Sequence, residues 1–199
     1  DVQPGASGYF EAAAQVELIG GNQPADRALG DIHPAGNPHL QLDPVRMAKV
    51  AKALAARLAE LDAAGRTAFR DRADDFREAV ETRLPDWQQR LAEVPGVLLY
   101  HPDGDYFLAR MGVPRLGYVE NKPGVPPTGS HLRDLVTRLE GERGVILRAP
   151  FHPAGPARTL ADRLGWPARS VPLDPPLGAD AQGYFEMIEQ WVTAAEAGK

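Results

Sequence analysis

Histidines and carboxylates are the residues of this chain best suited to chemistry, because its 199 residues include no cysteine. One of them, His39, lies on a loop that its neighbours stiffen, since Pro38 disfavours helical geometry at Asn37. A helix should begin just beyond this loop, because Asp43 is a good N-cap and Pro44 suits the first helical position. A stiff loop at a helix entrance can hold His39 as a metal ligand or as a catalytic imidazole.

Two further candidates, His101 and Asp174, directly follow the apolar runs 97–100 and 170–173, which are typical of buried strands. Open α/β sheets bind ligands at the carboxyl ends of their parallel strands. We therefore expect both side chains at one edge of a sheet, with His39 facing them from another part of the chain. Two imidazoles and one carboxylate suit a divalent ion such as zinc.

Two other histidines are candidate auxiliary ligands. His33 lies six residues before His39 on the same loop, and His152 follows the third expected strand of the sheet. For each of them a solvated or hydrogen-bonded surface histidine is the competing interpretation. The remaining histidine, His131, adjoins an expected helix cap and carries little functional weight.

The elements that must position these side chains change character along the chain. Residues 1–43 are expected to be mostly loop, with a helical turn at 9–14 and a short strand at 16–19. Apolar residues at three- and four-residue steps then predict two helical runs, 44–61 and 67–91, which form either a backbone linking two lobes or a helical hairpin. The remainder alternates strands with helices, the strands at 97–100, 116–119, 145–147 and 170–173 and the helices at 107–111, 128–139, 154–164 and 182–195.

This alternation predicts an α/β fold with a parallel sheet flanked by helices. We divide the chain into the remainder of an N-terminal lobe (1–43), a linking helical backbone (44–94) and a C-terminal α/β lobe (95–199).

The net charge is −5, which gives no reason to expect binding to nucleic acid or to an anionic membrane. No apolar run is long enough to be inserted in a membrane, and the polar first residues do not form a signal peptide. We expect the chain to lack its beginning.

Four motifs together resemble one known family, the zinc/manganese-type substrate-binding proteins of bacterial ABC importers. GNPH followed by LDP (36–44) is similar to the family's metal-ligating histidine loop ahead of a long helix, and Tyr100-His101 is similar to its ligand after the first strand of the C-terminal lobe. The other two similar segments are ENKPGVPP (120–127) and LDP with GYFEM (173–187). The resemblance covers essentially the whole chain, which would lack most of the family's N-terminal lobe.

The resemblance implies two α/β lobes joined by a long helix, with His39, His101 and Asp174 as metal ligands in the cleft between the lobes. It implies a binding protein rather than an enzyme, located in the periplasm or lipid-anchored outside the cell. Its partners would be the metal ion, an ABC transporter permease and, as a further candidate, a metallochaperone. Zinc leads over manganese, because nitrogen-rich ligation favours zinc. With the first-lobe ligand missing, water, His33, His152 or another chain would have to complete the coordination.

Two alternatives remain open from the residues alone. Three protein ligands and an open coordination position also describe a zinc metallohydrolase, for which Asp103, Asp105 or Glu120 could act as general base. The two aspartates could instead orient the imidazole of His101, and a solvated turn is their simplest interpretation. The second alternative is an interaction module that has the fold and binds no metal.

Overall fold

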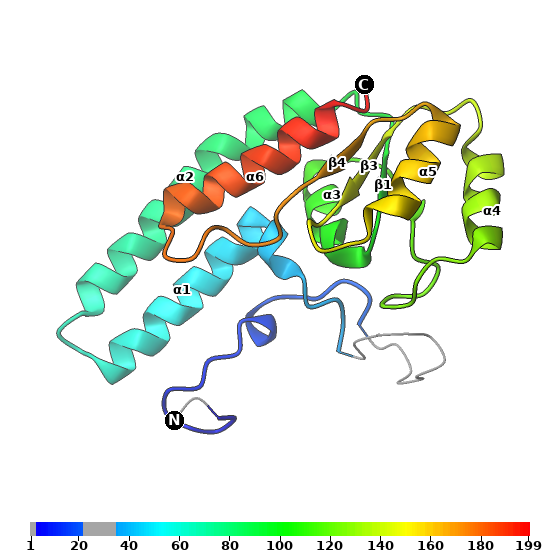
Figure 1. Cartoon of the computed structure of the whole chain (residues 1–199). Helices are drawn as coiled ribbons and strands as arrows, with labels where there is room; N and C mark the ends of the chain where they lie inside the picture. Colours follow the sequence, from blue (N-terminus) through cyan, green and yellow to red (C-terminus); the bar gives the residue numbers. More distant parts are fainter. Residues whose placement is uncertain (1–2, 22–34) are drawn as a thin grey trace.

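A parallel four-stranded sheet lies at the centre of the α/β part of the chain (Figure 1). The computed structural model describes residues 3–21 and 35–199. The strands lie in the order β2-β1-β3-β4, and their bounds are β1 Val97–Leu99, β2 Arg115–Tyr118, β3 Val145–Arg148 and β4 Ala168–Ser170. The two central strands are buried along their whole apolar runs, as strands covered on both faces require.

Helices cover both faces of this sheet (Figure 1). In the described part of the chain the α-helices are α1 Pro44–Leu61, α2 Arg66–Leu91, α3 Asp105–Met111, α4 Gly129–Leu139, α5 Ala154–Leu164 and α6 Ala181–Glu196, and short 3-10 helices occur at Ala13–Gln15, Leu40–Leu42 and Pro102–Gly104. Within the described residues, none of the helices is both long and apolar enough to cross a bilayer.

The alternation of side chains along the central strands divides the core into two layers. Leu99 and Leu147 pack into a cluster with α2, α3 and α6, whereas Leu98 and Ile146 pack against α4 and α5. Because successive strand residues point to opposite faces, each strand contributes to both layers. The expected α/β fold with a helix-flanked parallel sheet is therefore confirmed.

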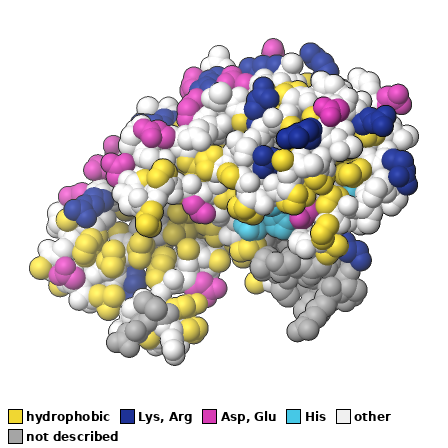
Figure 2. All heavy atoms as spheres, viewed as in Figure 1, with side chains coloured by type: hydrophobic (Ala, Val, Ile, Leu, Met, Phe, Trp, Pro, Cys, Tyr) yellow, Lys and Arg dark blue, Asp and Glu magenta, His cyan; other side chains and the backbone are white. Residues whose placement is uncertain are grey.

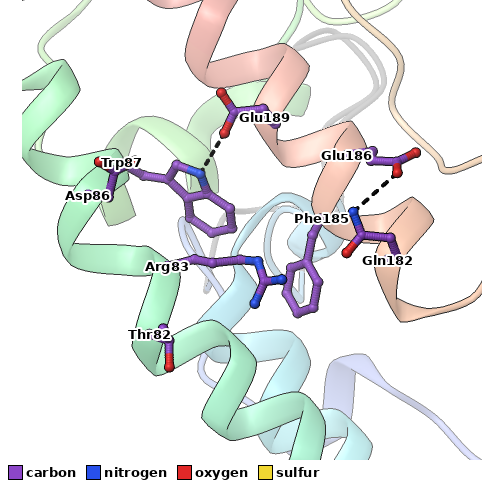
Figure 3. Close-up of a pocket in the computed structure, with 8 residues that line it drawn as sticks. All are labelled: Thr82, Arg83, Asp86, Trp87, Gln182, Phe185, Glu186 and Glu189. Carbon is purple, nitrogen blue, oxygen red and sulfur yellow. Dashed lines mark hydrogen bonds between the residues drawn. The ribbon is translucent and has the colours of Figure 1, made fainter.

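Helices α1 and α2 pack side by side as a hairpin, and α2 also packs along α6. Where α2 meets α6, the indole of Trp87 donates a hydrogen bond of 2.9 Å to Glu189, and the guanidinium of Arg83 lies 4.4 Å from the ring centre of Phe185 (Figure 3). This groove is lined by residues of α2 and α6 and contains no histidine. The expected candidate site therefore lies elsewhere.

Two expected strands differ from the structure. Residues 16–19 form no strand, although Val16, Leu18 and Ile19 do pack on a small cluster around buried Tyr106. The fourth strand is β4, which ends at Ser170 instead of extending to residue 173. Val171 still donates a backbone hydrogen bond to Arg148, but the next residue is a proline without an N–H, so the pairing ends there.

Leu99→Ala is expected to lower the free energy of unfolding by about 2–5 kcal/mol, because a fully buried leucine in a central strand leaves a cavity when it is truncated. The control is Leu177→Ala, since Leu177 is fully exposed. Urea unfolding of both variants measures the effect. Equal losses would contradict the placement of the core.

Candidate metal centre

Three histidines from distant parts of the chain meet at the carboxyl edge of the sheet. His101 directly follows the buried residue Tyr100 at the end of β1, His152 lies on the loop after β3, and His39 lies on the loop before α1. The rings of His39 and His101 meet edge to face with centroids 5.5 Å apart, and those of His101 and His152 are 5.9 Å apart. Figure 2 shows histidine side chains gathered in one patch on the molecular surface.

A carboxylate orients the central imidazole. Glu120, which lies just past the end of β2, is 2.9 Å from Nδ1 of His101 and also accepts a hydrogen bond of 3.0 Å from the backbone N–H of Gly124. A carboxylate on one ring nitrogen fixes the tautomer that leaves the other nitrogen unprotonated, which is the form a metal ion needs. From the sequence, Glu120 is a candidate only for a general base. Its position after a strand, the same signal that selected His101, could have identified it.

His152 is held differently. Its ring stacks on Tyr100 with centroids 4.5 Å apart, and its Nδ1 accepts a hydrogen bond of 3.1 Å from the backbone N–H of Ala149. Burial, followed by the nearby His101, lowers the pKa of His152 to about 4, so the ring is neutral at neutral pH. Because Nδ1 accepts a hydrogen bond, the proton of the neutral ring lies on Nε2. To bind a metal ion, His152 would have to give up the bond to Ala149 or turn its ring.

Asp103 lies beneath the histidines. It is buried, its Oδ2 lies 3.9 Å from Nδ1 of His152, and this oxygen has no hydrogen-bond partner among the described residues. Burial raises the pKa of Asp103 to about 7. In the described part of the chain, the neighbouring carboxylate Asp105 accepts hydrogen bonds from Tyr118 and pairs with Arg115. Neither aspartate is the hydrogen-bond partner of His101 there, since Glu120 takes that place and Asp103 approaches His152 instead.

The remaining predicted site residues lie outside this cluster. Asp174 is exposed on the segment between β4 and α6, four residues past the end of the strand, and it contacts no histidine in the described structure. His131 bonds through its ring to the backbone carbonyl of Tyr118. His33 lies outside the described residues. Within 3–21 and 35–199, no three His, Asp or Glu side chains are arranged to hold a metal ion.

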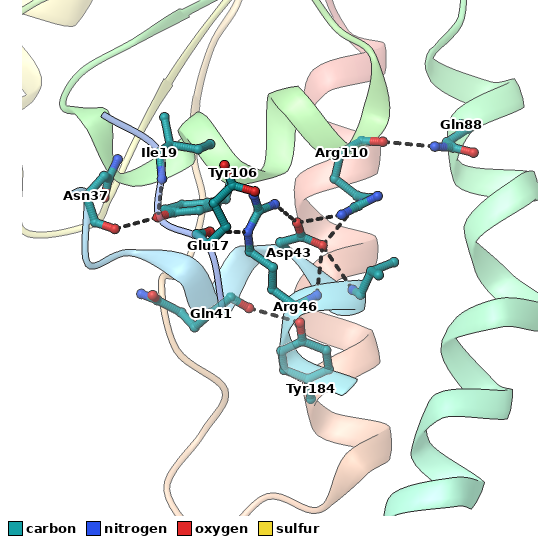
Figure 4. A network of polar contacts seen from close by, with 11 residues as sticks. Glu17, Ile19, Asn37, Gln41, Asp43, Arg46, Gln88, Tyr106, Arg110 and Tyr184 are labelled. Atoms are coloured by element: carbon teal, nitrogen blue, oxygen red, sulfur yellow. Dashed lines mark hydrogen bonds and ion pairs between the residues drawn. The ribbon is translucent and has the colours of Figure 1, made fainter. Parts of the chain in front are cut away.

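A buried ion-pair network fixes the helix entrance next to His39 (Figure 4). Asp43 is fully buried and caps α1 by accepting the backbone N–H groups of Val45 and Arg46. Its two carboxylate oxygens also bind Arg110 of α3, at 2.8 and 3.0 Å, and Oδ2 binds the side chain of Arg46. The predicted cap is therefore confirmed. Through Arg110 it also joins the start of α1 to α3, the helix that follows the loop of His101.

Residues 3–198 match one protein family, described as ZnuA, zinc-uptake complex component A, periplasmic. No curated protein sequence matches the chain. Among solved structures, the laminin-binding adhesin Lmb of Streptococcus agalactiae has a TM-score of 0.77 at 18% identity, with 96% of this chain and 71% of that chain covered.

The substrate-binding protein FpvC of Pseudomonas aeruginosa, solved with Mn²⁺, has a TM-score of 0.73 at 23% identity and covers 96% of this chain and 69% of its own. A crystal structure of ZnuA has a TM-score of 0.68 at 19% identity, with 83% and 62% covered. At these identities the structural likeness establishes the shared fold, and the family match extends over nearly the whole sequence. The chain belongs to the ZnuA family of periplasmic metal-binding components of ABC importers.

Proposed function

We propose that this chain binds a divalent transition metal, zinc in the first place, through His39 and His101, and delivers it to the permease of an ABC importer. The observation that supports this most directly is the edge-to-face approach of the two imidazoles, 5.5 Å between centroids, with Glu120 orienting one of them. Zinc is favoured over manganese because the candidate ligands are mainly imidazole nitrogens. The nearby carboxylate of Glu120 is already bonded to Nδ1 of His101, so it is not counted among them.

As the third ligand of the metal ion we propose Asp174, with His152 and His33 as auxiliary ligands. Asp174 lies on an exposed segment and would have to move toward the histidines, whereas His152 is already adjacent but would have to give up its backbone hydrogen bond. Both changes cost free energy. A site that must rearrange binds its metal more weakly than a preorganised one.

Calorimetric titration with Zn²⁺ and Mn²⁺ at neutral pH tests the proposal. The parent should bind zinc more tightly than manganese, and His39→Ala should lose most of that affinity. Comparing Asp174→Ala with His152→Ala identifies the third ligand, because only the variant that removes a ligand should weaken binding strongly. No binding by the parent, or unchanged binding by His39→Ala, would overturn the proposed site.

Glu120→Gln is expected to weaken zinc binding about 10–100-fold, the usual effect of losing the outer partner of a ligating histidine. The amide can no longer accept the imidazole proton as an anion, so the ring is less basic and less well oriented. Glu140→Gln is the matched control, because Glu140 is exposed at the end of α4. Competition against a chromophoric chelator measures both affinities. If the two variants bind alike, Glu120 does not orient the ligand.

A further inference from the structure

The side chain of Asn37 connects the two loops that carry His39 and His101. Its Oδ1 accepts a hydrogen bond of 2.9 Å from the backbone N–H of His39, which closes the local turn. Its Nδ2 donates a hydrogen bond of 2.7 Å to the backbone carbonyl of Pro102, the residue after His101. One amide group therefore bonds to both histidine loops at once, although they are far apart in the sequence.

A second set of contacts holds the backbone of Asn37 (Figure 4). The hydroxyl of the fully buried Tyr106 donates a hydrogen bond of 2.6 Å to the carbonyl of Asn37 and accepts one of 2.9 Å from the N–H of Ile19. Because Tyr106 belongs to α3, directly after the His101 loop, it ties the backbone of the His39 loop to the same element. The two sets of bonds leave Asn37 little freedom to move relative to His101.

The chemistry of this position requires an amide. Asparagine and glutamine combine an acceptor oxygen with an NH₂ donor on one planar amide, and the shorter asparagine also favours the turn with its own backbone. Aspartate would lose the donor to Pro102. Its charge would also face Asp105, whose Oδ2 is 3.5 Å from Nδ2 of Asn37 and which already accepts bonds from Tyr118.

We propose that Asn37 is a positioning residue for the metal centre, which sets the distance between His39 and His101 by bridging their loops. This inference rests on the proposed function for its effect on metal binding, but the bridge itself consists only of protein groups. Without the bridge, the loop of His39 keeps the hydrogen bond from Tyr106 to the backbone of Asn37 but loses its direct bond to the residue after His101, so the two imidazoles are held together less closely. The metal would then have to order the two imidazoles as it binds, and the free energy of ordering them would weaken its binding.

The decisive variant is Asn37→Ser. Serine can still accept a hydrogen bond within the turn, but its short side chain has no amide group to donate to Pro102. The matched control is Asn121→Ser, because Asn121 is exposed and makes no side-chain hydrogen bond in the described structure. Tyr106→Phe, which removes only the hydroxyl, is a second test should Asn37→Ser fail to fold. Far-UV circular dichroism and the melting temperature report folding.

Two readouts separate the bridge from the metal site. In the metal-free parent, ring protons of His39 and His101 should show a nuclear Overhauser effect, which Asn37→Ser should lose and Asn121→Ser should keep. Affinity for Co²⁺, measured with its visible absorption spectrum, should fall about 10–100-fold in Asn37→Ser, with a changed spectrum that an overall loss of stability would not produce. Tyr106→Phe should show a smaller change of the same kind.

The outcomes are distinguishable. If folded Asn37→Ser keeps the effect between the two rings and binds Co²⁺ as the parent does, the positioning role is wrong. If Asn37→Ser does not fold, the same result from Tyr106→Phe overturns the proposal. If the parent binds no metal but the variant loses the contact between the rings, the bridge is supported and the proposed function fails.

Discussion

His101→Ala should lower the affinity for zinc by more than the roughly 100-fold that removal of an outer partner produces. His101 is the central member of the histidine cluster, with His39 on one side and His152 on the other. Its removal deletes the proposed central ligand and also leaves Glu120 without its imidazole partner. His39 and His152 each lie against the ring of His101, so the substitution also removes the group that lies between them.

The control for this experiment is His131→Ala, which removes a histidine of the same lobe whose ring bonds to a backbone carbonyl. Its affinity for zinc should stay within twofold of the parent. Thermal unfolding with and without zinc gives an independent readout, because a ligand that binds only the folded state raises the melting temperature more the more tightly it binds. Equal losses of zinc stabilisation in the two variants would contradict the assignment of His101.

Asp43→Asn should be among the most destabilising single substitutions in this chain. Breaking a buried ion pair from one side costs about 3–5 kcal/mol, because a charge is left without its partner. We expect the lower end of this range, since Arg110 retains 29% exposure and can be partly solvated. Asparagine is itself a good N-cap, so the loss would report the ion pairs with Arg110 and Arg46 and not the start of α1.

The control for the cap is Asp180→Asn. Asp180 caps α6 in the same way, by accepting N–H groups of the first turn, but it is exposed and pairs with no arginine among the residues that the structure describes. Its substitution should change the free energy of unfolding by less than about 0.5 kcal/mol. Urea unfolding at pH 7 compares the two variants. Similar losses would show that the arginines contribute little.

The effect of Asp43→Asn should also depend on pH. Burial alone would raise the pKa of Asp43, but hydrogen bonds from Arg110 and Arg46 outweigh it and hold the pKa below its ordinary value of 3.8. A carboxylate with a lowered pKa in the folded state stabilises the fold above its unfolded pKa, and this contribution is lost as the pH falls through the folded pKa. The free energies of unfolding of parent and variant should therefore begin to converge as the pH falls below about 3.8, and they should meet once the pH is below the lowered pKa of the folded state. A difference that does not shrink over this range would contradict the electrostatic origin.

Local patterns predicted the secondary structure well where a chemical signal marks the ends. The bounds of helix 154–164 are those that the sequence predicts, and Asp43 caps α1 as predicted. The strand expected at 16–19 failed because an apolar tetrapeptide does not distinguish a strand from a loop packed on a tyrosine. Such a distinction depends on residues far away in the sequence.

The candidate site was partly predictable for the same reason. The rule that ligands follow parallel strands selected His101, and His39 was found from its stiff loop; the structure brings the two together. The same rule applies to Glu120, which follows the expected strand 116–119 and is therefore a candidate for the site on the same grounds. The bonds of Asn37 to Pro102 and of His152 to Ala149 arise only when the loops are packed, so no spacing in the sequence indicates them.

The wide separation of the three histidines along the chain has a consequence for the lifetime of the protein. An unfolded chain cannot bring such distant groups to one ion, so metal binding acts almost wholly on the native state. At a free metal concentration 100 times the dissociation constant, this adds about 2.7 kcal/mol to the stability. Proteases that cleave transiently opened molecules would then remove empty protein faster than loaded protein. The amount of this receptor would follow the supply of its metal even without any change in its synthesis.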